Sequence, residues 1–257
     1  RLVGSEMCIR DRGWEEQLSF VRDALGPKLK ETGLKTKIYA FDHNYNYDNM
    51  LEQQGYPMKI YEDENAASFL TGAAYHNYGG DREELNNVNG KFPDKELIFT
   101  ETSIGMWNDG RNLEKRLMED MEETALGTVN NWCKAVIVWN LMLDNERGPN
   151  REGGCQTCYG AVDIDRSDYK TITRNSHYYI IGHLSSVVKP GAVRIGSKGY
   201  TADGIMYSAF ENLDGTEALV LLNNTDGTKN ITVNSGERSF TYEVPAKAVA
   251  SFRWNLY

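Results

Sequence analysis

The feature that most restricts the fold of this chain is an alternation of two kinds of segment between residues 14 and 188. Stretches with apolar residues at helical spacing alternate with short apolar runs rich in β-branched and aromatic residues. Strands separated by helices in this way usually pair in parallel. The pattern therefore predicts β/α units, and four such strands would form half of a (β/α)8 barrel.

The expected elements occur in a fixed order without an internal repeat. We predict helices over residues 14–33, 62–69, 111–132 and 172–188, and strands over residues 36–42, 71–76, 96–101 and 135–141. Gly33 is expected to end the first helix, and Pro27 predicts a kink or a new helical start within it. The run over 135–141, AVIVWNL, is the most continuous apolar segment and suits a strand covered on both faces.

The pattern of apolar and turn residues changes after Pro190. Short alternating segments separated by Gly, Asn or Asp turns follow at 191–196, 204–211, 217–223, 229–234, 238–244 and 247–254. This pattern predicts a small antiparallel β-sandwich. The expected domains are thus a partial barrel over 13–188, holding strands five to eight, and a β-sandwich side domain over 189–257.

Composition excludes several classes of function. The chain has 257 residues and a net charge of −9, and it lacks a Lys/Arg cluster, so a nucleic-acid partner is not expected. No apolar stretch approaches the roughly 20 residues of a transmembrane helix. The pair Cys155 and Cys158 lacks a second Cys or His pair, so a small loop disulfide or two free thiols is favoured over a metal site. No cofactor is expected.

The first 12 residues, RLVGSEMCIRDR, have neither an initiator Met nor the zones of a signal peptide. They resemble translated read-through of a sequencing adapter, and we predict that residues 1–12 are a non-native tail. The compartment stays open at this point, although secretion or export to the periplasm is expected for the full-length protein.

Polar residues end each of the four predicted barrel strands. Asp42-His43-Asn44 ends the first, His76 with Tyr78 the second, Glu101 the third and Trp139-Asn140 the fourth. The carboxyl ends of barrel strands open onto one face, where the active sites of such barrels lie. A buried carboxylate such as Glu101 is costly unless it is paired or functional. Each residue alone has a structural alternative: the histidine as a hydrogen-bonded structural residue, Trp139 as barrel core and Asp42 as a helix cap. Four polar strand ends in succession nevertheless favour one shared site.

These strand ends belong to longer segments that resemble glycoside hydrolase family 30, which contains glucosylceramidases and endo-β-1,6-glucanases. The segments are LGPKLKETGLKTKIYAFDHN, GAAYHNYGGD, DKELIFTETS, AVIVWNLMLDNERGPN and YYIIGHLSSVVKPGAVRIGS, in family order. The resemblance spans residues 25–197 and implies the C-terminal half of a TIM barrel followed by the β-sandwich side domain of the family.

The resemblance also implies roles for the strand-end residues. Glu101 resembles the catalytic nucleophile of a retaining β-glycosidase, and Tyr78 is expected to donate a hydrogen bond to it. His76, Trp139 and Asn140 match positions that line the sugar subsite, with Trp139 as a stacking face. Asp42, His43 and Asn44 are also expected to meet a carbohydrate substrate, namely a β-glucan or a β-glucoside.

One part of the family pattern is not found. The general acid/base of the family is the Glu of an Asn-Glu pair at the end of strand four, which would precede residue 14; the pair Asn145-Glu146 follows strand eight instead. We therefore expect a fragment that holds the nucleophile without its acid/base and is inactive alone.

Two hypotheses follow for the function. The first is a retaining β-glycosidase acting on β-1,6-glucan or glucosylceramide-like substrates. The alternative is a non-catalytic carbohydrate-binding protein with a degenerate barrel. Substitution of Glu101 separates them, because only an enzyme loses turnover while it keeps its ligand.

Overall fold

The computed structural model describes residues 12–45, 50–196 and 202–255, which form two compact units. The first comprises the chain up to Ser103 with Asn131–Trp139 and Arg147–Cys158, and the second comprises Ile104–Asn130, Asn140–Glu146 and the chain from Tyr159 onward. Most of the expected tail over 1–12 lies outside the described residues.

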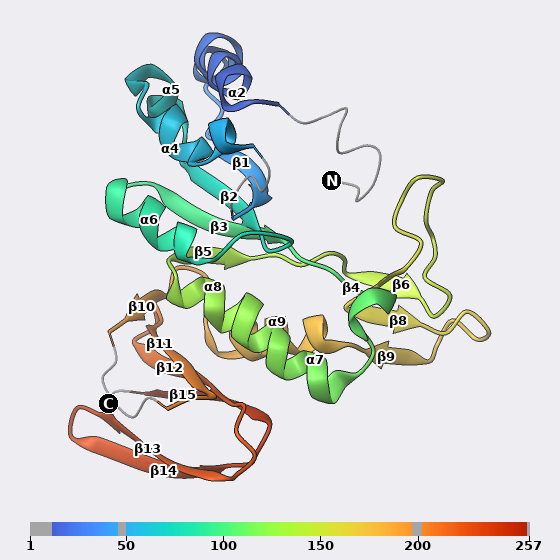
Figure 1. Ribbon diagram of the computed structural model, residues 1–257. Helices are drawn as coiled ribbons and strands as arrows, with labels where there is room; N and C mark the ends of the chain where they lie inside the picture. Colours follow the sequence, from blue (N-terminus) through green and yellow to red (C-terminus); the bar gives the residue numbers. More distant parts are fainter. Residues whose placement is uncertain (1–11, 46–49, 197–201, 256–257) are drawn as a thin grey trace. The chain divides into compact units, whose positions relative to one another are not determined.

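A four-stranded parallel sheet forms the centre of the first unit (Figure 1). Its strands are β1 (Tyr39–Asn44), β2 (Gly72–His76), β3 (Glu96–Glu101) and β5 (Cys133–Val136), and they are adjacent in the order of the chain. This order confirms the predicted succession of β/α units.

A continuous helical segment precedes β1. It consists of α2 (Trp14–Phe20), the π-helical turn η1 (Val21–Leu25) and α3 (Gly26–Thr32), and it ends at Gly33 with a φ of 67°. Pro27 stands in the first turn of α3, where its missing N–H is tolerated. The wider π-turn just before it takes the place of the predicted kink.

The remaining helices of the first unit are shorter than the pattern suggests. They are the 3-10 turn η2 (Leu51–Gln53), α4 (Tyr56–Tyr61), α5 (Glu64–Phe69) and α6 (Glu83–Lys91). The sequence reasoning missed α4 and α6. In α6 three Asn and one Gly weaken helical propensity, and Leu85 and Val88, both fully buried, carry its packing.

The core of this unit lies between the helices and one face of the sheet. Tyr75, Phe99, Ile60 and Leu85 are completely buried within one apolar cluster. Along β3 the buried residues Leu97 and Phe99 alternate with half-buried ones, so β3 turns one face to the helices.

The strand predicted over 135–141 needs correction. β5 spans Cys133–Val136, and beyond it the chain joins the sheet only through a bridge between Ser103 and Trp139. Cys133 is buried, but Ile137 is 52% exposed, so the run is not covered on both faces. The apolar side chains of this run are therefore only partly buried.

The second unit contains a long helical segment, and its last part is the set of strands after Pro190, which we call the β module. α7 (Leu113–Asp120), the π-turn η4 (Met121–Ala125) and α8 (Leu126–Asn130) confirm the helix predicted over 111–132. α9 (Ser176–Val187) packs against α7, and the Asp120 carboxylate accepts hydrogen bonds from Arg116 and from Ser176 at the start of α9. Because Asp120 is buried, these donors offset its loss of water.

Short strands occupy the loops around these helices. They are β4 (Ile104–Gly105), β6 (Met142–Asp144), β7 (Cys158–Tyr159), β8 (Val162–Ile164) and β9 (Ile172–Arg174), with a 3-10 turn η3 at Met106–Asn108. β6, β8 and β9 form a small sheet that was not predicted, and β9 replaces the start of the helix expected over 172–188. Buried Asp163 stabilises this region by pairing with Arg111 at 2.9 Å and accepting from Asn175 at 3.0 Å.

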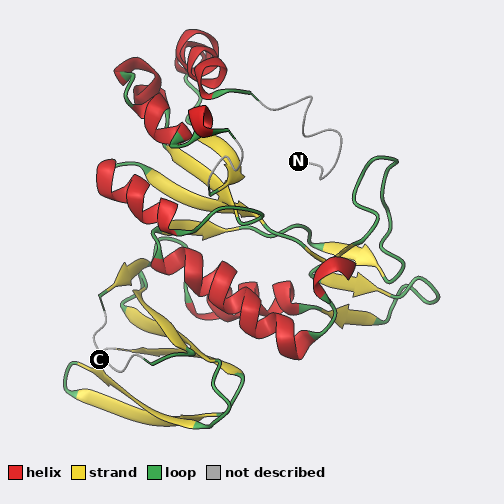
Figure 2. Ribbon diagram, in the orientation of Figure 1, coloured by secondary structure: helices red, strands yellow, loops and turns green. Residues whose placement is uncertain are grey.

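All six strands expected after Pro190 are present. β10 (Val193–Ile195), β11 (Ile205–Glu211), β12 (Thr216–Asn223) and β15 (Ala248–Asn255) form an antiparallel sheet, and β13 (Lys229–Ser235) pairs with β14 (Arg238–Val244) as a hairpin (Figure 2). Among the described residues, no helix combines the length and the apolar character that a bilayer crossing requires.

A cluster of charged side chains lies at the amino ends of the barrel strands. Glu96 accepts hydrogen bonds from Tyr39 at 2.5 Å and Lys37 at 2.9 Å, and Lys134 lies 3.4 Å away. Partial burial by itself raises the pKa of Glu96, but the donors and the lysine charges lower it to about 2. Polar contacts at this end of a barrel usually serve stability.

We expect Glu96→Gln to lower the free energy of unfolding by about 1–3 kcal/mol at neutral pH, since it removes a charged acceptor. The contribution of Glu96 is present above its unfolded pKa of 4.5 and is lost as the pH falls toward about 2. Urea denaturation between pH 7 and pH 3 measures this. Glu31→Gln, in an exposed ion pair with Lys28, is the matched control and should change stability little.

Candidate active site

Glu101 is the last residue of β3 and is only 9% exposed. The parallel register pairs it with His76, the last residue of β2, after an irregularity in the ladder between Tyr75 and His76. The pairing of the two strands thus shifts just before their last residues, a kind of irregularity that is common next to active sites. The fold thus presents a buried carboxylate at the carboxyl edge of the sheet, as the sequence predicts.

His76 and Asp42 form a hydrogen-bonded pair beside Glu101. His76 Nε2 lies 3.0 Å from Asp42 Oδ1, and the His76 side chain is almost fully buried whereas that of Asp42 is 60% exposed. Thr100 Oγ1 donates to the same oxygen at 2.7 Å. The hydrogen bond from His76 is the main cause that lowers the pKa of Asp42 to about 2, and Thr100 adds to it against the opposing effect of burial.

The strand that carries Asp42 is irregular at this residue. Phe41 and Asp42 both have positive φ, 76° and 61°, and the pairing of β1 with β2 shifts between Phe41 and His43. Residues other than glycine uncommonly adopt positive φ, and backbone strain of this kind is often found at functional sites.

Tyr78 follows β2 and reaches toward Glu101. Its hydroxyl donates to Ser103 Oγ at 2.9 Å. Burial raises the pKa of this hydroxyl; the Ser103 contact opposes this, and the charge and hydrogen bonding of Glu101 add to the increase. Tyr78 therefore stays protonated and able to donate, and it shares its hydroxyl between Ser103 and the carboxylate.

Asn44 and His43 end β1 beside these groups. Asn44 is buried at 8% exposure, and its Oδ1 has no hydrogen-bond partner among the described residues. The ring of His43 lies 6.5 Å from that of His76. A buried amide oxygen without a partner costs free energy, so Asn44 offers an acceptor to a ligand hydroxyl.

Trp139 and Asn140 stand on the segment that follows β5. The N–H of Trp139 donates to the carbonyl of Thr102 at 2.8 Å, which places Trp139 beside the Glu101 strand within the first unit. Asn140 belongs to the second unit, where its carbonyl accepts from Ala161 at 2.9 Å. Its Oδ1 is buried and also lacks a hydrogen-bond partner among the described residues.

Two further residues of the site were missed by the sequence reasoning. Thr100 and Ser103 flank Glu101, and they bond Asp42 and Tyr78, respectively. The signal was present in the string Thr-Glu-Thr-Ser, where hydroxyl side chains surround the carboxylate.

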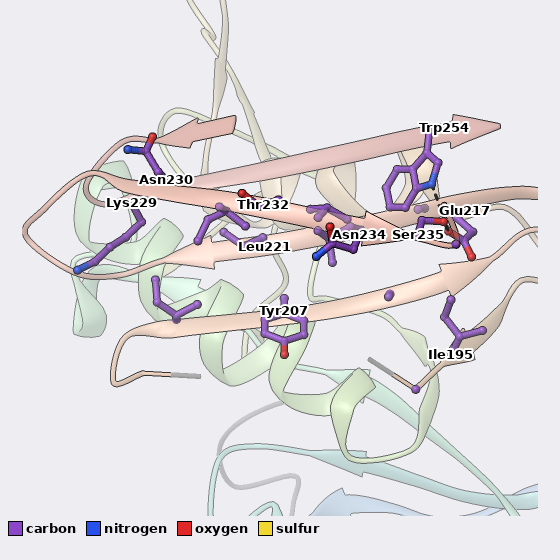
Figure 3. A pocket seen from close by; sticks show the side chains of 18 residues that line it. Ile195, Tyr207, Glu217, Leu221, Lys229, Asn230, Thr232, Asn234, Ser235 and Trp254 are labelled. Carbon is purple, nitrogen blue, oxygen red and sulfur yellow. Dashed lines mark hydrogen bonds between the residues drawn. The ribbon is translucent and has the colours of Figure 1, made fainter. Parts of the chain in front are cut away.

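Other features lie outside this group of residues. Cys155 and Cys158 form a disulfide, one of the two alternatives left open by the sequence. Within the part of the chain that the structure describes, no three His, Cys, Asp or Glu side chains are grouped as metal ligands. A cavity of about 650 Å³ lies in the β module, where Tyr207, Leu221 and Trp254 are among its lining residues (Figure 3). None of the predicted site residues lines it.

Comparison with known proteins adds to the geometry. Residues 6–188 match the profile of the glycosyl hydrolase family 30 TIM-barrel domain, and residues 191–252 match that of the glycosyl hydrolase family 30 beta sandwich domain.

Curated relatives include endo-1,6-beta-D-glucanase BGN16.3 of Trichoderma harzianum, 30% identical over 92% of this chain and 46% of its own length. Putative glucosylceramidase 2 of Caenorhabditis elegans is 31% identical over 81% of this chain and 40% of its own length. The chain thus spans about half the length of the curated relatives it matches.

Two solved structures share the fold of the whole described chain. The endo-beta1,6-glucanase BT3312 superposes with a TM-score of 0.94 at 70% identity, covering 96% of this chain and 54% of that one. SrfJ from Salmonella typhimurium superposes with a TM-score of 0.84 at 26% identity, with the same coverage.

The pair of Asp42 and His76 generates a prediction about acid titration. In His76→Phe, which removes the main donor, we expect the pKa of Asp42 to rise from about 2 toward its usual 3.8. Carbon-detected NMR titration of side-chain carboxyls measures this shift. The charged form of Asp42 stabilises the fold above pH 3.8, and this contribution to stability disappears as the pH falls toward 2. The stability of the variant should therefore depend less on pH in this range.

An internal control comes from Asp63, whose lowered pKa depends on Ala66 and Arg22. Its titration should be unchanged in the same variant. An unchanged Asp42 titration would show that the hydrogen bond to His76 does not form in solution.

Proposed function

The chain belongs to glycoside hydrolase family 30, and we propose that it supplies Glu101 as the catalytic nucleophile of a retaining β-glycosidase that cleaves β-1,6-glucan. The observation that carries this proposal is the position of Glu101. It ends a parallel strand, is nearly buried, and lies beside the hydroxyl of Tyr78, which also donates to Ser103.

The choice of β-1,6-glucan follows the 70% identity with a solved endo-beta1,6-glucanase. Glucosylceramide-like β-glucosides are the second substrate class, since several relatives bear the name glucosylceramidase. Both substrates present a β-glucosyl unit to the nucleophile, so the chemistry at Glu101 is the same.

In the proposed reaction the ionised carboxylate of Glu101 attacks the anomeric carbon from the face opposite the leaving group. The glycosidic bond breaks, a covalent glycosyl–enzyme ester forms, and water then hydrolyses the ester with overall retention. Hydroxyl donors such as Tyr78 suit this role, because they stabilise the charged form before attack and the displaced charge when Glu101 leaves.

The second carboxyl of a retaining pair stands about 5–5.5 Å from the nucleophile. We propose that it comes from a part of the protein outside residues 12–255, so that this chain alone hydrolyses unactivated glucan much more slowly than a complete enzyme would. Asn44, His76 and Trp139 are proposed to contact the sugar, with Trp139 stacking on the ring and the amide oxygen of Asn44 accepting from a hydroxyl.

Activated substrates test this division of roles. Dinitrophenolate leaves without a proton, and azide attacks without a general base, so 2,4-dinitrophenyl β-glucoside with azide bypasses the acid/base. We expect slow turnover by this chain that azide accelerates, with β-glucosyl azide as product. Cleavage of β-1,6-glucan should be slower than in a complete enzyme by on the order of 10²–10⁴-fold.

Glu101→Ala should abolish the β-configured product, and any azide product should then be α, from direct displacement. Glu146→Gln, in an exposed ion pair with Arg166, is the matched control and should behave like the parent. Product configuration is read by NMR. Formation of β-glucosyl azide by Glu101→Ala would refute the role of Glu101 as the nucleophile. Glucan binding without any turnover of the activated substrate would favour the non-catalytic alternative.

A further inference from the structure

Side chains from two neighbouring strands meet one carboxylate oxygen of a third strand. Asp42 Oδ1 on β1 is 3.0 Å from His76 Nε2 on β2 and 2.7 Å from Thr100 Oγ1 on β3. Asp42 thereby spans the middle strand and reaches the residue that immediately precedes Glu101.

The backbone around Asp42 is shaped for this reach. The positive φ values of Phe41 and Asp42 accompany the shift in pairing between Phe41 and His43. The ring of Phe41 packs 4.9 Å from Tyr56, and its N–H donates to Gln17 Oε1 at 2.8 Å. The surrounding contacts thus hold a backbone conformation that residues other than glycine usually avoid, as is common at functional sites.

The electrostatics fit a fixed charge rather than a titrating one. Asp42 keeps more than half of its side chain in solvent, which limits the cost of its charge, while His76 is buried. The lowered pKa of Asp42 keeps it ionised throughout the range in which glycosidases of this type would work. A charged acceptor holds an imidazole N–H more strongly than a neutral one does.

We propose that Asp42 is a positioning residue whose carboxylate locks the ring of His76 through Nε2–H and fixes the end of β3 through Thr100, so that Glu101 and His76 meet the sugar in one geometry. This assignment differs from a direct sugar contact by Asp42, and it rests on the proposed function of Glu101. Its value to the reaction is preorganisation, since a displacement of about 1 Å can cost ~10²-fold in rate.

The direct test observes the ring N–H of His76 by NMR in protein labelled with ring-¹⁵N histidine. The chain has four His residues, and His76→Gln assigns the signal by its disappearance. We expect a downfield Nε2–H signal protected from exchange with water. In Asp42→Asn it should move upfield and exchange roughly tenfold faster, because the acceptor becomes neutral. No substrate is needed, so this result is independent of the proposed function.

Two further variants keep the test decisive. Asp94→Asn, two residues before the start of β3 and with its side chain 75% exposed, is the matched control and should leave the signal unchanged. Thr100→Val keeps the pair of Asp42 and His76; it should preserve the His76 signal but shift the backbone amide of Glu101. If Asp42→Asn does not fold, the parent signal and Thr100→Val still decide the proposal.

A kinetic measurement separates positioning from substrate contact. In the azide assay Asp42→Asn should lower kcat by ~10–10²-fold with little change in KM. A rise in KM at constant kcat, an unprotected His76 N–H in the parent, or an unchanged signal in Asp42→Asn would each overturn the proposal. An inactive parent would instead contradict the proposed function, and the NMR result would stand by itself.

Discussion

Parallel pairing of β1, β2 and β3 sets the last residues of three strands beside one another, and the candidate site depends on this alignment. Asn44, His76 and Glu101 are matched across the sheet by register, although they are far apart in the chain. The register is shifted once in each ladder, between Phe41 and His43 and between Tyr75 and His76. These shifts decide which side chains emerge at the edge.

The two ends of the same sheet handle polar groups differently. At the amino ends Glu96 is satisfied by Tyr39 and Lys37, so its charge is balanced within the protein. At the carboxyl ends the buried oxygen of Asn44 has no partner among the described residues. A polar group that the protein itself pairs contributes to stability, whereas one left with hydrogen-bonding capacity is ready for a ligand.

The buried carboxylates of the second unit are paired by groups of the protein itself. Asp163 accepts from Arg111 and Asn175, and Asp120 accepts from Arg116 and Ser176. Both hold helices and short strands together, and neither is a strand-end residue of the parallel sheet. Burial of an acid alone therefore does not identify a site in this protein; what distinguishes Glu101 is its place at the end of a strand.

The sequence by itself determined the order of β/α units, the six strands after Pro190 and the last residues of β1, β2 and β3, because hydrophobic periodicity and turn residues are local properties. It did not predict α6, whose Asn-rich segment is helical only through the packing of Leu85 and Val88. Only the tertiary structure decided that Asp42 bonds His76 and Thr100, and that Ser103 shares the hydroxyl of Tyr78. Those contacts join different strands or the loops that follow them. They depend on shifts in strand register and on the positive φ angles of Phe41 and Asp42, which no local sequence pattern encodes.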